Sequence, residues 1–227
     1  MIEEKNQLEA EKKELKRKKK LKRWFRFLRC VYYSGVQLFV PIKRLGFKSI
    51  PDGPYIIVGN HLHVLDTVPI ALASKQPVHF LAKNELSNKA IGRWFVKKSQ
   101  CILVNRDGTD VRAVMQSMKY LKNGESISLF PEGSRNKTDE IFLPFKSGAA
   151  TLAIRTKTPI IIMIQCKKIR LFHRNYFYFT EPFELTEYYD KKLTEEIVNE
   201  ADEKLRLKML ELYHMLDEQL KNKKKKK

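Results

Sequence analysis

Cysteine is scarce in this chain. The three that occur, Cys30, Cys101 and Cys166, are widely spaced and form no C-x-x-C pair. An odd, scattered set of this kind argues against a disulfide framework and against a zinc finger. The sequence therefore predicts a protein of the reducing cytoplasm.

Long apolar runs are also missing. No stretch of about eighteen apolar residues occurs, and the longest one, residues 30–42, is interrupted by Ser34, Gly35, Gln37 and Pro41. The first thirty residues are charged and lack the apolar centre of a secretory signal. We expect neither a conventional membrane-spanning helix nor a secretory signal.

Acidic residues are few in two stretches of the chain, and the net charge of +19 is unevenly distributed. Residues 12–29 hold eleven Lys or Arg against one acid, and residues 221–227 hold six lysines and no acid. Basic arms suit a polyanion, either nucleic acid or an anionic membrane leaflet, where each cation near the surface contributes about 1 kcal/mol. For the lysine run, a solvated tail is the alternative.

The N-terminal segment combines this charge with apolar residues. Residues 1–22 are typical of a charged helix or a frayed arm, and an apolar set at helical spacing follows, with arginines beside it. We favour a helix in the plane of the lipid headgroups over one packed on the protein core. The apolar set is Trp24, Phe27, Leu28, Val31, Leu38 and Phe39, and the arginines are Arg23, Arg26 and Arg29.

The remaining chain alternates short apolar runs with amphipathic segments. A hydrophobic content of 43% and a charged content of 31% are typical of a folded protein. The alternation predicts a single α/β domain with a central mixed, largely parallel sheet flanked by helices. We expect a basic amphipathic segment at 1–45, the core at 46–190, and a long C-terminal helix with its lysine tail at 191–227. Strands are predicted at 55–59, 78–82, 101–104, 126–130, 159–165 and 176–179, and helices at 67–73, 111–121, 148–156 and 190–220.

Two groups capable of acid–base chemistry follow the first of these strands, within residues 60–66. A loop between a strand and a helix lets Asp66 fold back toward His61, which residues five apart on one continuous helix could not do. A carboxylate on one imidazole nitrogen leaves the other nitrogen to act as a base. The alternative is that Asp66 caps the helix and His61 is incidental.

Two other chemistries fit this segment poorly. His61, His63 and Asp66 resemble the H-x-H-x-D-H run of metallo-hydrolases, but the aspartate falls one place late. A serine hydrolase needs a G-x-S-x-G turn, and residues 124–128 do not supply one. We expect no bound metal.

A second cluster, residues 130–135, also follows an apolar strand. Gly133 lets the backbone approach a ligand closely, and Arg135 offers a forked donor to a phosphate. Glu132 could accept a hydrogen bond from a substrate hydroxyl. The alternative is a structural turn with a surface ion pair.

Cations stand at three predicted strand ends. Lys83 follows the strand at 78–82, Arg106 follows the strand at 101–104, and Arg135 follows the strand at 126–130. Ligands of such sheets bind beyond the carboxyl ends of the strands, so the three cations can converge. Taken singly, each is more typical of a solvated surface charge.

The ordered motifs resemble those of the glycerolipid acyltransferase family, and specifically its bacterial 1-acylglycerol-3-phosphate acyltransferases. The resemblance covers about residues 50–165. The motifs are Asn60-His61-x4-Asp66, Phe80-Leu81-Ala82-Lys83-x-Glu85-Leu86, Ile102-Leu103-Val104-Asn105-Arg106, Phe130-Pro131-Glu132-Gly133-Ser134-Arg135, Pro144-Phe145-Lys146-Ser147-Gly148-Ala149 and Thr158-Pro159-Ile160-Ile161.

The resemblance implies roles for these positions. His61 is expected to be the general base and Asp66 its orienting partner, in direct transfer of an acyl group from acyl-CoA or acyl carrier protein to a lysophospholipid hydroxyl. No cofactor is implied. The resemblance also places the enzyme on the cytoplasmic face of the cell membrane, as a peripheral or monotopic protein. The implied substrate-binding residues are Lys83, Arg106, Glu132, Gly133, Ser134 and Arg135.

Two alternatives stay open from the sequence. The same chemistry could serve another acceptor, such as glycerol 3-phosphate or a different lysolipid. The basic arms are also compatible with a nucleic-acid-binding protein, although no aromatic RNA-binding signature or recognition-helix motif is visible, so no nucleic-acid partner is expected.

Overall fold

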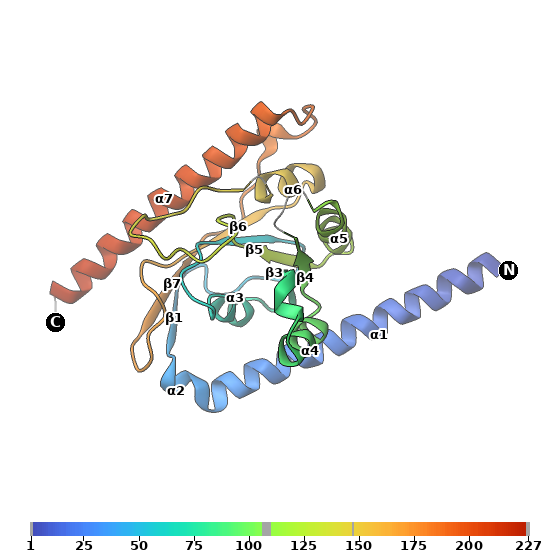
Figure 1. Cartoon of the computed structure of the whole chain (residues 1–227), viewed down its shortest axis with the longest axis horizontal. Helices are drawn as coiled ribbons and strands as arrows, with labels where there is room; N and C mark the ends of the chain where they lie inside the picture. Colours follow the sequence, from blue (N-terminus) through green and yellow to red (C-terminus); the bar gives the residue numbers. More distant parts are fainter. Residues whose placement is uncertain (1, 106–109, 147, 226–227) are drawn as a thin grey trace.

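A computed structural model describes residues 2–105, 110–146 and 148–225 of the chain. Within them, seven strands form one sheet in the order β1-β7-β6-β2-β5-β3-β4 (Figure 1). Neighbouring strands are parallel, except that β6 and β7 are antiparallel. The strands are β1 (Ile42–Gly46), β2 (Ile56–Gly59), β3 (Val78–Lys83), β4 (Ile102–Val104), β5 (Ser126–Leu129), β6 (Ile160–Ile164) and β7 (Asn175–Phe179).

Helices cover both faces of the sheet, giving three layers (Figure 1). On one face lie α5 (Val111–Lys122), α6 (Ala149–Thr156) and α7 (Glu195–Lys225), and on the other lie α1 (Ile2–Val31), α3 (Thr67–Ala73) and α4 (Ala90–Ser99). Two short 3₁₀ turns, Asn84–Ser87 and Thr186–Tyr188, connect these elements.

The central strands are buried on both faces, which explains their continuous apolar sequences. Successive side chains point to opposite faces of a strand. Accordingly Ile56 and Val58 belong to the core beneath α5, α6 and α7, and Ile57 belongs to the core beneath α1 and α3. All three side chains are fully buried.

The N-terminal helix is part of the core. Helix α1 continues through a π-helical turn, Tyr32–Val36, into α2 (Gln37–Phe39). Leu21, Phe25 and Tyr32 are buried, with exposed fractions of 1%, 2% and 6%. The apolar set predicted from the sequence only partly coincides with the buried side of the helix, because four of its members are exposed: Phe27, Val31, Leu38 and Phe39. The helix thus packs on the protein with one side and presents a second apolar side outward.

A buried polar cluster fastens α1 to the amino end of the sheet. Arg17 donates to Glu125 and to the side chain of Gln100, and its guanidinium lies 5.2 Å from the centre of the Tyr120 ring. Glu125 also bonds Nε2 of the fully buried His79, at 3.0 Å. Burial acts to raise the pKa of Glu125, but the hydrogen bonds from His79 and Arg17 outweigh it, and the pKa is lowered.

The predicted fold class is confirmed, and every predicted strand and helix has a counterpart. The sequence analysis missed β1 and α4. The three-segment division of the chain stays a prediction, and the sheet begins inside its first segment, since β1 pairs with β7. Among the described residues, no helix combines the length and the apolar character needed to cross a bilayer.

Candidate active site

Five neighbouring strands, β6, β2, β5, β3 and β4, run parallel and end at one edge of the sheet, here called the carboxyl edge. The loop after β2 carries His61 and Asp66, and the loop after β5 carries Glu132 to Arg135. Lys83 ends β3. The topology therefore brings the predicted site residues to a common edge, as expected for a parallel sheet.

His61 and Asp66 form a hydrogen-bonded pair. Nδ1 of the imidazole lies 3.0 Å from Oδ2 of the carboxylate, which is fully buried. The same oxygen accepts hydrogen bonds from the backbone N–H groups of Leu62 and His63, each at 2.7 Å. Asp66 is the N-cap residue of α3, but its side chain makes no capping bond. The capping alternative is therefore wrong, and the carboxylate instead orients the imidazole.

The imidazole of His61 is held in a defined plane and is partly open to solvent. It stacks on Phe130 with a centroid distance of 4.2 Å and an interplanar angle of 13°. The exposed fraction of the side chain is 19%. Because Asp66 accepts from Nδ1, Nε2 carries the free lone pair of the neutral ring. This geometry gives a base whose reactive nitrogen a ligand can approach.

Glu132 holds the backbone of His61 in place. Its Oε1 accepts from the His61 N–H at 2.8 Å, and its Oε2 accepts from the Leu143 N–H at 2.9 Å. The side chain is only 3% exposed. Burial raises the pKa of this carboxyl, while the two backbone donors act to lower it. Each oxygen thus accepts from a backbone donor, so Glu132 links the loop of His61 to that of Leu143, and its predicted bond from a substrate hydroxyl stays a prediction.

Asn136 binds the other backbone polar group of His61, its carbonyl, and was missed by the sequence analysis. Its N–H donates to the His61 carbonyl at 2.7 Å, and its side chain is 1% exposed. The side-chain amide bonds Thr138 and the Glu140 carbonyl, which fixes the following loop. Backbone partners of this kind have no signal in the sequence, so only the structure reveals them.

The connection between β2 and β6 depends on Asn60 and Gln165, to which the sequence analysis assigned no role. The side-chain amide of Asn60 donates to the Gln165 carbonyl at 2.8 Å, and the Gln165 N–H donates to Asn60 Oδ1 at 3.0 Å. Both side chains are fully buried. This reciprocal bonding fixes the strand end from which the His61 loop departs.

Gly133 lies in the left-handed region, with φ of +64°. A Cβ atom at this position would also approach Cδ of Lys146 to 3.0 Å. Glycine is therefore needed for the turn and for the close passage of the Lys146 side chain. Lys146 is an exposed cation near the site, and no role was assigned to it from the sequence.

Two of the three predicted phosphate-binding cations can be located in the structure. Lys83 and Arg135 are exposed at the carboxyl edge, on or just after the neighbouring strands β3 and β5, and Ser134 is half-buried beside them. Arg106 lies outside the described residues. Across the described parts of the chain, no group of three or more His, Cys, Asp and Glu side chains is arranged to hold a metal ion.

An imidazole that is hydrogen-bonded to a buried carboxylate at the edge of an α/β sheet has the geometry that a general base requires. The chain belongs to the Acyltransferase family, whose sequence model matches residues 42–164. This confirms the resemblance found in the motifs, and the matched segment contains the strands, loops and helices that build the site.

Individual relatives agree with this assignment. A 1-acyl-sn-glycerol-3-phosphate acyltransferase of Bacillus subtilis is 32% identical over 123 residues, which are 53% of this chain and 60% of the relative. The enzyme of that name from Saccharomyces cerevisiae is 28% identical over 141 residues, covering 60% of this chain and 46% of the relative. The matches thus span about half of the relatives' length.

A solved structure shares the fold. The crystal structure of the 1-acyl-sn-glycerophosphate (LPA) acyltransferase PlsC from Thermotoga maritima is 22% identical and superposes with a TM-score of 0.56. The superposition covers 86% of this chain and 96% of that one. The three-layer arrangement described above is therefore a known one.

Proposed function

We propose that this protein transfers a fatty acyl group from an acyl thioester to the 2-hydroxyl of 1-acylglycerol 3-phosphate, giving phosphatidic acid. The observation that carries the proposal is the 3.0 Å contact between His61 Nδ1 and the buried carboxylate of Asp66 in a chain of the Acyltransferase family. The names of the curated relatives support the acceptor. Acyl-CoA and acyl carrier protein both supply the required thioester.

In the proposed reaction, Nε2 of His61 accepts the proton of the acceptor hydroxyl as its oxygen attacks the thioester carbonyl. Asp66 stabilises the resulting imidazolium through Nδ1. The tetrahedral intermediate then expels the thiolate, which takes the proton from His61. One C–S bond breaks and one C–O bond forms, and no acyl-enzyme is needed.

The phosphate of the acceptor is proposed to bind the cations of the carboxyl edge. Lys83, Arg106 and Arg135 are the predicted grip, and the exposure of Lys83 and Arg135 on neighbouring strand ends supports it. Lys146, which passes over Gly133, is a fourth candidate. A guanidinium or ammonium group forms strong, charge-assisted hydrogen bonds with a phosphate.

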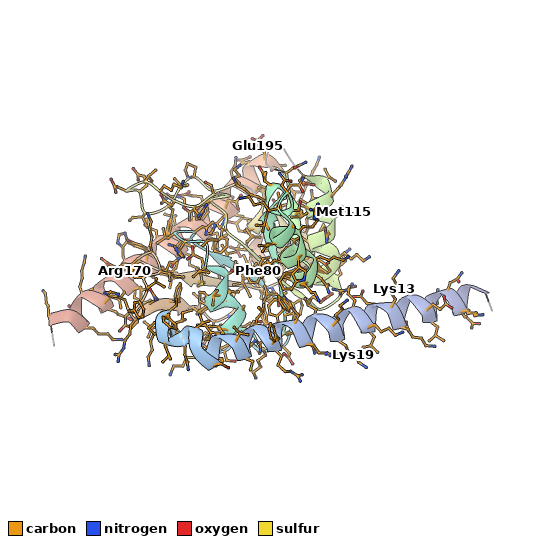
Figure 2. The ribbon with its side chains drawn as sticks, turned by 60° about the horizontal axis from the view of Figure 1, so that its bottom comes forward. Lys13, Lys19, Phe80, Met115, Arg170 and Glu195 are labelled. Atoms are coloured by element: carbon orange, nitrogen blue, oxygen red, sulfur yellow. The ribbon has the colours of Figure 1, made fainter. Side chains whose placement is uncertain are left out.

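We further propose that the protein works on an anionic membrane surface. Exposed lysines line α1, including Lys13 and Lys19 (Figure 2). The outward apolar side of the N-terminal segment includes Phe27, which is 56% exposed, and Leu38, which is 72% exposed. Apolar side chains next to cations are typical of helices that lie at a lipid interface.

The catalytic proposal is tested by comparing two histidine variants. Purified protein is incubated with lysophosphatidic acid and either acyl-CoA or acyl carrier protein loaded with the acyl group, and phosphatidic acid is quantified. Loss of a general base lowers the rate by about 10² to 10⁴-fold, so His61→Ala is expected to lose activity to that degree. His63→Ala, whose imidazole does not bond Asp66, serves as the matched control. Equal rates for His61→Ala and wild type would refute the mechanism.

The acceptor is tested in the same assay. Glycerol 3-phosphate and lysophosphatidylcholine replace lysophosphatidic acid at equal concentration. The proposal expects lysophosphatidic acid to give the highest kcat/KM, because it combines a phosphomonoester with an acyl chain. A preference for a zwitterionic lysolipid would contradict the phosphate grip.

The membrane proposal is tested with vesicles. Lys13→Gln with Lys19→Gln is expected to weaken binding to anionic vesicles, by roughly fivefold per lysine. Lys119→Gln with Lys122→Gln, exposed on α5, removes the same charge elsewhere and is expected to have a smaller effect. Equal loss from both pairs would mean that α1 has no special contact with the membrane.

A further inference from the structure

The loop between β6 and β7, residues 165–174, exposes two large apolar side chains. Leu171 is 59% exposed and Phe172 is 69% exposed. The loop starts at the active site, where Gln165 is bonded to Asn60, and reaches the end of the N-terminal segment beside α2 (Figure 1). It therefore connects the surroundings of His61 with the outward apolar side of that segment.

Phe172 contacts the end of the N-terminal segment directly. Its backbone N–H donates to the Phe39 carbonyl at 2.6 Å, and the two rings meet edge to face with their centres 5.5 Å apart. Leu38 and Phe39 are 72% and 51% exposed. Leu38, Phe39, Leu171 and Phe172 thus form one exposed apolar surface, here called the apolar tip, from segments far apart in the sequence.

The loop is built so that the Phe172 ring stays outside. The φ angle of Phe172 is +58°, a left-handed conformation that is unfavourable for an aromatic residue. The side chain of Asn175, only 7% exposed, accepts from the Arg170 N–H and donates to the carbonyls of Arg170 and His173. A buried amide therefore maintains a backbone conformation that places a large ring in solvent.

The charge around the apolar tip indicates what covers it. The two segments that meet there, residues 23–51 and 166–180, contain no Asp or Glu. Lys168, Arg170 and Arg174 are exposed on the loop, and Figure 2 shows Arg170 at the α2 end of the molecule. Lys223 near the end of α7 also reaches this part of the molecule, since its Nζ lies 5.6 Å from the Tyr176 ring centre. Protruding apolar side chains encircled by cations match an anionic lipid leaflet.

We infer that the β6–β7 loop is a second membrane-inserting element, which enters the same anionic leaflet as α2 and is flanked by the cations of the loop and by Lys223. The inference rests on the membrane-surface location proposed above. It assigns Leu171 and Phe172 a function, because they provide an insertion point in addition to the N-terminal segment. With two insertion points, the carboxyl edge keeps a fixed orientation toward the leaflet that holds the acceptor.

The test measures vesicle binding of the full chain in the absence of acyl donor. Wild type and the double variant Leu171→Ser, Phe172→Gly are sedimented with vesicles of phosphatidylglycerol and phosphatidylcholine. Glycine accepts the φ of residue 172 without strain, so the variant is expected to fold, which circular dichroism and thermal unfolding verify. Met115→Ser on α5, which removes a side chain that is 62% exposed, is the matched control.

The expected result is a loss of roughly tenfold to a hundredfold in the partition coefficient of the double variant, with Met115→Ser unchanged. Equal binding by the variant and wild type overturns the inference. The inference is also overturned if analytical ultracentrifugation gives the double variant a lower mass than wild type while both bind vesicles equally. The apolar tip would then contact a second copy of the chain. Acyltransferase activity is not part of this readout, so a failure of the catalytic proposal is recognised separately by the His61→Ala comparison.

Discussion

Replacement of Glu132 by Gln tests whether this residue positions the His61 backbone or contacts the acceptor. Its two carboxylate oxygens accept from the His61 and Leu143 N–H groups, at 2.8 and 2.9 Å. Glutamine keeps one acceptor and turns an amide N–H toward the other backbone donor. At 3% exposure, water does not replace the lost acceptor. Leaving a buried backbone donor unpaired costs about 1 to 3 kcal/mol.

This cost has two measurable consequences. A chain of this length loses about 2 to 4 °C in Tm per kcal/mol, so Glu132→Gln is expected to unfold about 2 to 12 °C lower, less whatever is recovered by removing a buried charge. The imidazole of His61 also shifts, and a displacement of about 1 Å can lower the rate about a hundredfold. We therefore expect kcat to fall roughly tenfold to a hundredfold while the KM for the acceptor changes little.

The assay combines thermal unfolding with kcat and KM for lysophosphatidic acid. Asp139→Asn, on the loop that follows Asn136, removes an exposed carboxylate and is expected to change none of the three quantities. A raised acceptor KM in Glu132→Gln, with normal kcat and Tm, would refute the positioning role. Glu132 would then contact the acceptor, as the sequence alone suggested.

Three further predictions follow from the contacts described. Asp66→Asn keeps the size of the side chain but removes the charge that stabilises the imidazolium of His61, so kcat is expected to fall about ten- to a hundredfold; a rate within about twofold of wild type would count against the pair. Phe25→Ala empties a core position and is expected to lower the free energy of unfolding in urea by about 3 to 5 kcal/mol. Phe27→Ala, at an exposed position, is expected to lower it far less, and equal losses would contradict the packing of α1. The lowered pKa of Glu125 means that its contribution to stability is complete above its ordinary value of 4.5 and is lost as the pH falls through the folded-state value. Glu125→Gln is expected to flatten that part of the Tm profile, and an unchanged acid dependence would exclude Glu125 as its source.

The sheet was predictable where strands are buried on both faces. The strands β2 and β6 consist almost entirely of β-branched residues, which leaves little choice of structure. The strand β1 lies at the edge of the sheet, and its sequence, Ile-Lys-Arg-Leu-Gly, shows neither a continuous apolar run nor a regular alternation. Helix α4 contains Gly92, where a Cβ would come within 1.9 Å of the Leu86 carbonyl oxygen. That close approach requires glycine and weakens the helical pattern in the sequence.

The site shows the same division. The pairing of His61 with Asp66 followed from a strand-to-helix loop, because both partners are side chains with recognisable chemistry. The hydrogen bonds that hold the His61 backbone could not be predicted, because Glu132 and Asn136 bind backbone atoms that every residue possesses. Arg106 lies outside the described residues, so its place in the phosphate grip stays a prediction.

Helix α1 is continuous from the basic arm into the core, and this limits where the chain can be shortened for expression. Arg17 donates to Glu125 and Gln100, and Leu21 and Phe25 lie in the interior, all within the basic stretch 12–29. The arm is therefore not a detachable tag. A shortened version intended for expression should begin before Glu14, because one that starts at residue 46, the predicted start of the core, would lack Leu21, Phe25 and Tyr32 from its interior.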